Sequence, residues 1–138
     1  RSLDSHHLIS IGSEGNALLR WSRKFKQEHR VKNIDYATAH VWVENWGWYD
    51  PKKPNTFPKA LKKAKKYVRR HLRISRKLKM PMVLEEFGLA RDGGSYDPAS
   101  PTTYRDQYFA ELFEVMAEHV LVAAQLSGVA GGPADLSR

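Results

Sequence analysis

Short apolar segments alternate with longer segments of helical periodicity along this sequence. The apolar segments are residues 8–11, 31–43 and 81–87, and the helical segments that follow them are 17–29, 58–80 and 101–124. Short apolar runs that end at Gly, Pro or polar turn residues are typical of strands covered on both faces. Strands that alternate with helices predict an α/β protein with a parallel sheet, because parallel neighbours need a crossover connection.

The segment 58–80 has the clearest helical pattern. Its apolar or small residues recur at steps of three and four and form one stripe: Leu61, Ala64, Val68, Leu72, Ser75 and Leu78. Pro81 is expected to end this helix, because proline has no N–H to donate and clashes with the preceding turn. The segment 101–124 is expected to begin with Ser100 as its N-cap and Pro101 at its first position.

The formal charge of +8 comes from one stretch of the chain. Thirteen of the 23 Lys and Arg residues lie between Lys52 and Lys79, where there is no Asp or Glu, and the other ten are outnumbered by the 15 acidic residues. We interpret these cations as the solvated outer face of a helix. The alternative is a polybasic helix that binds nucleic acid or anionic lipid through Lys59 to Lys79.

Several common kinds of site are not expected from the composition. The chain of 138 residues has no cysteine, which excludes disulfides and thiolate metal sites, and the His6-His7 pair has no partner at metal-binding spacing. No cofactor is therefore expected. The longest apolar runs fall short of the roughly 20 residues of a membrane span, and no signal peptide is visible at the start of the chain.

Polar and aromatic side chains gather just after each predicted strand, where parallel α/β folds bind their ligands. They are Ser13 and Glu14, the stretch from His40 to Trp48, and Glu85 with Glu86. Neighbours on a strand face opposite ways, so only one of the two glutamates is expected to point into a site. That carboxylate could act as a nucleophile or a general acid or base, or it could simply form an ion pair at the strand end.

Aromatic residues near these strand ends suggest a surface for stacking. His40 and Trp42 share a strand face and could orient a carboxylate, or they could be a packed core pair. Trp46, Trp48 and Tyr49 follow in a loop, where exposed indoles would suit the apolar faces of sugar rings. The alternative is that this loop folds back and covers the sheet.

Four segments together resemble family 5 glycoside hydrolases, and especially the endo-β-1,4-mannanases. Residues 2–15 are similar to the approach to the fifth strand of that barrel, 34–48 to the sixth strand and its loop, 81–92 to the seventh strand, and 100–106 to the start of the next helix. The likeness runs from about residue 2 to residue 115. It implies a partial (β/α)8 TIM barrel with roughly strands 5 to 7 and their helices. Residues 1–125 would be the C-terminal half of the catalytic domain, and 126–138 a divergent or frayed tail.

The resemblance also implies roles for single residues. Glu86, directly before Phe87-Gly88, matches the catalytic nucleophile, and His40 matches a histidine that shapes the site beside it. Trp42 stands where the wider family more often has a tyrosine that contacts the nucleophile. The substrate-binding positions implied by the resemblance are Trp42, Trp46, Trp48 and Glu14. The implied substrate is β-mannan or a related polysaccharide, and the implied location is secreted or periplasmic.

Two departures from the family pattern shape the functional hypothesis. The acid/base glutamate of the family follows an asparagine, yet the chain has no Asn-Glu pair, and no tryptophan follows Trp48 to match the one on the eighth strand. We therefore expect a fragment of a retaining mannanase that is inactive alone and self-associates through its exposed half-barrel, with no nucleic-acid or membrane partner. The alternatives are a non-catalytic carbohydrate-binding relic, or a basic nucleic-acid or membrane binder.

Overall fold

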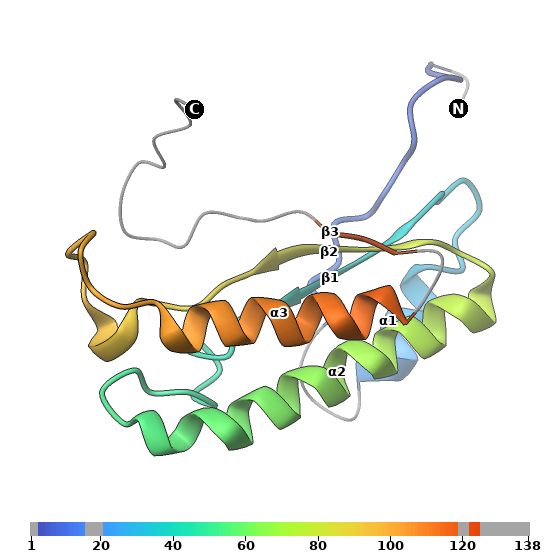
Figure 1. The fold of residues 1–138 in the computed structure, drawn as a ribbon. Helices are drawn as coiled ribbons and strands as arrows, with labels where there is room; N and C mark the ends of the chain where they lie inside the picture. Colours follow the sequence, from blue (N-terminus) through green and yellow to red (C-terminus); the bar gives the residue numbers. More distant parts are fainter. Residues whose placement is uncertain (1–2, 16–20, 119–121, 125–138) are drawn as a thin grey trace.

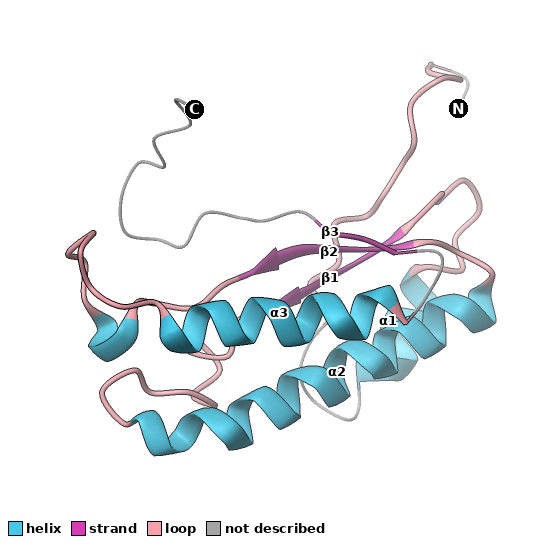
Figure 2. Cartoon of the chain, viewed as in Figure 1, coloured by secondary structure: helices cyan, strands magenta, loops and turns pink. Residues whose placement is uncertain are grey.

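The computed structural model describes residues 3–15, 21–118 and 122–124. Its centre is a parallel sheet of three strands in the order β1 (Ala37–Val41), β2 (Met82–Phe87) and β3 (Val122–Ala124). The helices α1 (Trp21–Glu28), α2 (Phe57–Leu78) and α3 (Thr103–Ala117) lie on one face of this sheet (Figures 1 and 2). The predicted α/β class with a parallel sheet is confirmed.

Helix α2 matches the helix predicted from the 58–80 periodicity. Pro58 lies in its first turn, where a missing N–H costs nothing. Its end is marked by Lys79, whose φ of 55° is left-handed, and by the Met80 N–H, which donates to the Ser75 carbonyl at 3.1 Å. The buried face of α2 includes Leu61, Ala64, Val68, Leu72 and Ser75 from the predicted stripe.

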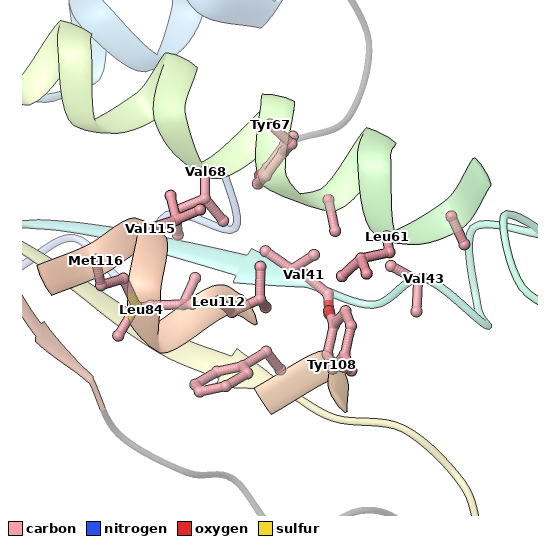
Figure 3. Close-up of a cluster of buried hydrophobic side chains, with 14 of the residues drawn as sticks. Val41, Val43, Leu61, Tyr67, Val68, Leu84, Tyr108, Leu112, Val115 and Met116 are labelled. Carbon is pink, nitrogen blue, oxygen red and sulfur yellow. The ribbon is translucent and has the colours of Figure 1, made fainter. Parts of the chain in front are cut away.

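The hydrophobic core lies between the sheet and the helices α2 and α3. Val41 of β1 and Leu84 of β2 are fully buried, and they face Val68 of α2 and Leu112 of α3 (Figure 3). Burying each such side chain is worth about 1.5–3 kcal/mol. The Tyr108 hydroxyl of α3 donates to the Val41 carbonyl at 3.1 Å, which fixes the helix against the carboxyl end of β1.

The strand predicted at residues 8–11 does not form a regular ladder. The Asp35 N–H donates to the Ile9 carbonyl at 2.9 Å, and the Ile9 N–H donates to the Asp35 carboxylate at 2.7 Å. Gly12 then adopts a φ of 60°, which breaks the extended backbone, and Leu8 stays 71% exposed. This segment therefore follows β1 as an irregular edge.

The third helix is shorter than the sequence predicted, and a strand follows it. Helix α3 has Thr102 at its N-cap position and ends at Ala117, so the predicted cap at Ser100 is wrong. The Ser100 hydroxyl instead donates to the Ser95 hydroxyl at 2.7 Å. Residues 122–124, predicted to be helical, pair with β2, because this pairing satisfies the backbone groups on its free edge. The predicted tail at 126–138 lies outside the described residues.

Candidate active site

A bulge between β1 and β2 sets the positions of Glu85 and Glu86. Ala39 pairs with Leu84, but the next residue of β1, His40, pairs with Glu86, so Glu85 has no opposite residue in β1. An extra residue of this kind interrupts the alternation of side chains along a strand. Both glutamates consequently reach the same histidine, and the expectation that one of them points away from the site is wrong.

His40 lies between the two carboxylates. Its Nδ1 is 3.1 Å from Glu86 Oε2, and its Nε2 is 3.3 Å from Glu85 Oε2. A neutral imidazole has one N–H and can donate to one carboxylate, whereas the protonated ring can donate to both. The His40 side chain is 14% exposed, against 25% for Glu85 and 44% for Glu86. The carboxylate of Glu86 is thus the one that is open to a ligand.

Trp42 gives Glu86 a second neighbour from the same strand. Its indole Nε1–H donates to Glu86 Oε2 at 3.1 Å, so this oxygen contacts both His40 and Trp42. His40 and Trp42 are two residues apart and share a face of β1. Within the described part of the chain, Glu86 Oε1 has no hydrogen-bond partner. A carboxylate held through one oxygen and open at the other has the geometry that a nucleophile needs.

Trp46 and Trp48 lie against α2. Their ring centroids are 5.0 Å apart, and Trp46 is 5.3 Å from the ring of Tyr67. The Lys63 Nζ lies 5.3 Å from the centroid of Trp48. Both indoles are half-buried against the core. The loop after β1 folds back onto the helix, which is the packing alternative to a sugar-stacking surface, and none of these contacts joins the two indoles to Glu86.

Glu14 contributes to the site through its backbone. Its carbonyl accepts the His40 N–H at 2.8 Å and the Tyr67 hydroxyl at 2.9 Å, while its side chain is exposed. Burial raises the pKa of the Tyr67 hydroxyl, with a smaller contribution from the charge of Glu14, so this donor keeps its proton. The Glu14 carbonyl therefore ties β1 and α2 to the segment that precedes them.

A family model described as "GH family 5 beta-mannosidase-like" matches residues 1–131. The chain belongs to glycoside hydrolase family 5. The resemblance read from the sequence is confirmed, and so is the partial barrel, because the chain superposes on a solved mannosidase of this family. Mannan endo-1,4-beta-mannosidase 5 of Arabidopsis thaliana is 28% identical over 132 residues, which are 84% of this chain and 28% of that protein.

Solved structures show the same relationship. A family 5 mannosidase from Rhizomucor miehei superposes with a TM-score of 0.77 at 32% identity, over 87% of this chain and 31% of its own. A mutant of that mannosidase was solved in complex with mannosyl-fructose. An endo-1,4-beta-D-mannanase from Thermotoga petrophila, with a TM-score of 0.61 at 20% identity, shares the fold. The family 5 chain thus spans between 28% and 38% of the length of the three relatives named here.

Two further carboxylates in this family 5 chain, Glu85 and Glu44, hold other groups near the site in place, and the sequence did not predict these contacts. Glu85 bonds the far side of His40, and the adjacent acidic pair was the signal that could have pointed to it. Glu44 accepts the Ala90 N–H at 2.5 Å and so joins the loops that follow β1 and β2. No spacing in the sequence marks Glu44, because its partner is a backbone group 46 residues away.

The described residues offer neither a metal site nor a membrane-spanning helix. Among the residues with described positions, no group of three His, Cys, Asp or Glu side chains is placed to hold a metal ion. Nor does that part of the chain contain a helix with the length and apolar character that a bilayer span requires.

Proposed function

We propose that this chain provides the nucleophile side of the active site of a retaining endo-β-1,4-mannanase, which cleaves internal bonds of mannan. The observation that carries the proposal is Glu86 at the carboxyl end of β2, in contact with His40 and Trp42 and open at its second oxygen. The names of the relatives support the substrate, since they are mannan endo-1,4-beta-mannosidases. Because mannan is a polymer, we also propose a secreted or periplasmic protein.

The reaction would proceed by double displacement. Glu86 attacks the anomeric carbon while an acid protonates the leaving oxygen, and water then hydrolyses the glycosyl-enzyme ester. His40 and Trp42 hold the Glu86 carboxylate in position for the attack. No cofactor is needed, because the two steps use only carboxyl groups and water.

Hydrolysis also requires a second carboxyl group, which acts as the acid/base. A retaining glycosidase places its acid/base about 5–5.5 Å from the nucleophile, on the other side of the scissile bond. Glu85 does not meet this requirement. It lies in β2 next to Glu86, and its carboxylate contacts the opposite side of the His40 ring. The family's acid/base follows an asparagine, and these 138 residues contain no Asn-Glu pair. We therefore propose that the chain alone binds mannan but hydrolyses it poorly.

Calorimetry with mannohexaose, together with an assay for released sugars, tests this proposal on the purified chain. We expect binding of mannohexaose, weaker binding of cellohexaose and little product. Normal turnover would show that the acid/base has been assigned wrongly. Absence of binding to either oligosaccharide would contradict the proposed substrate class.

A further inference from the structure

The charge of α2 is only partly neutralised by α3. Helix α2 carries ten Lys or Arg residues and no Asp or Glu. Two of these cations form ion pairs across the seam between the helices. Lys65 pairs with Glu111 and lies 3.9 Å from Glu114, and Arg69 pairs with Glu118 at 3.0 Å. Lys65 and Arg69 therefore face α3. The other eight Lys and Arg residues of α2 are not paired with the described carboxylates of α3.

Three of the remaining cations line a groove beside this seam. Lys62, Lys66 and Arg73 are exposed, and none of them forms an ion pair with a carboxylate of the described residues. The groove has a volume of about 810 Å³ and runs between α2 and α3. Its one acidic side chain, Glu111, is already paired with Lys65. We call this feature the cationic groove.

The other end of the cationic groove is apolar and aromatic. Pro54 and Pro58 line it, together with Tyr104 from the first turn of α3. The Tyr104 ring is half-buried and packs 4.9 Å from the ring of Phe57, which holds it in place. Cations beside a fixed aromatic ring suit a sugar that carries a carboxylate, because the ring packs on an apolar face and the acid pairs with the cations.

The same residues disfavour the other classes of polyanion. A helix that binds an anionic membrane places apolar side chains next to its cations, but none of the large exposed hydrophobic residues of the described chain lies on α2. Single-stranded nucleic acid is usually held by several aromatic platforms on which bases stack. The cationic groove offers Tyr104 alone, since Phe57 is 3% exposed.

We propose that the cationic groove binds an acidic polysaccharide, a polymer whose sugars carry carboxylate groups. The inference rests on the proposed function in one respect, because a mannan-degrading protein works among other polysaccharides. The groove uses none of the groups around Glu86, so it would attach the protein to an acidic polymer without occupying the candidate active site.

Binding of polygalacturonate to the full chain tests the proposal. We expect the affinity to fall about ten- to twentyfold from 50 to 200 mM salt if about three charges are contacted. Replacing the three cations together, in Lys62→Gln, Lys66→Gln and Arg73→Gln, should weaken binding at least tenfold at the lower salt. Gln keeps the helix propensity of Lys and Arg, and circular dichroism checks that α2 is intact.

The matched control removes the same charge elsewhere. The triple variant Arg23→Gln, Lys26→Gln and Lys32→Gln should bind polygalacturonate within about twofold of the unsubstituted chain. An equal loss in both variants would overturn the proposal, because net charge alone would then explain binding. Tighter binding of duplex DNA, lost in the first variant, would overturn it in favour of nucleic acid.

Mannohexaose binding is measured on the same protein. Binding of mannohexaose without polygalacturonate overturns the groove proposal and leaves the proposed function intact. Binding of polygalacturonate without mannohexaose supports the groove and contradicts the proposed substrate of Glu86.

Discussion

Glu86 depends on two donors that come from one strand, and each can be removed separately. His40 and Trp42 both contact Glu86 Oε2. Their shared face could be predicted from the sequence, because residues two apart on a strand point the same way. The position of Glu85 could not be predicted, because it follows from a bulge in the pairing with β1 and no local pattern marks that bulge.

The substitution Trp42→Phe tests the indole donor. A hydrogen bond to a charged group contributes about 1.5–3 kcal/mol, so losing it should misplace Glu86 and slow its reactions about tenfold or more. The measurement is the rate of covalent labelling by 2-deoxy-2-fluoro-β-mannosyl fluoride, whose fluoride leaves without an acid. Trp46→Phe is the control and should label at the unsubstituted rate. Equal rates in all three proteins would argue against a role for the indole.

Gly15 occupies a position where a side chain would collide with α2. Its φ is 83°, and an added Cβ would lie 2.6 Å from the Tyr67 hydroxyl and 3.2 Å from His71 Nε2. We expect Gly15→Ala to destabilise the chain by about 1–3 kcal/mol in denaturant unfolding. Gly47→Ala is matched, because Gly47 has a φ of 65° with open space around it. If the two variants lose equal stability, the contact with Tyr67 is unimportant.

The helices were easier to predict than the strands and caps. Helix α2 has six turns of periodic apolar residues, and a pattern of that length leaves little freedom for its position. The segment 8–11 has only four residues, and its geometry depends on Gly12 and on a distant carboxylate, Asp35. Residues 122–124 look helical in isolation and become a strand because the edge of β2 is free. Local periodicity does not contain such tertiary information.

Buried tyrosines of α2 and α3 donate hydrogen bonds to the segment before β1 and to β1 itself. They also make the stability of the folded chain depend on pH. Burial raises the pKa of Tyr67 and Tyr108, and raises the pKa of Tyr49 to about 12, with smaller contributions from nearby carboxylates. An unfolded tyrosine titrates near 10. The folded chain keeps these protons above pH 10 while the unfolded chain loses them.

Stability should therefore be complete below pH 10 and fall as the pH rises from 10 towards 12. Thermal unfolding followed by circular dichroism at pH 8, 10 and 11 measures this. The variant Tyr67→Phe, which has no proton to lose at this position, should show a smaller decrease. A melting temperature that does not change up to pH 11 would mean that these hydroxyls are accessible to water in the folded chain.

The sheet as a whole has edges that this chain covers only in part. Beside β1 lies the irregular segment 8–14, which makes scattered hydrogen bonds, and Leu8 and Ile11 are exposed there. Open strand edges and exposed apolar side chains favour association. We expect the apparent mass in sedimentation to rise with protein concentration. A monodisperse monomer that melts cooperatively would contradict this expectation.

Covalent labelling with the fluoro sugar shows whether Glu86 is the nucleophile. The fluoro sugar is incubated with the purified chain, and the labelled peptide is located by mass spectrometry. We predict one glycosyl group, on Glu86, which is absent from Glu86→Gln and still present in the exposed control Glu14→Gln. A label on Glu85, or equal labelling of the Glu86→Gln variant, would contradict the assignment of Glu86 as the nucleophile.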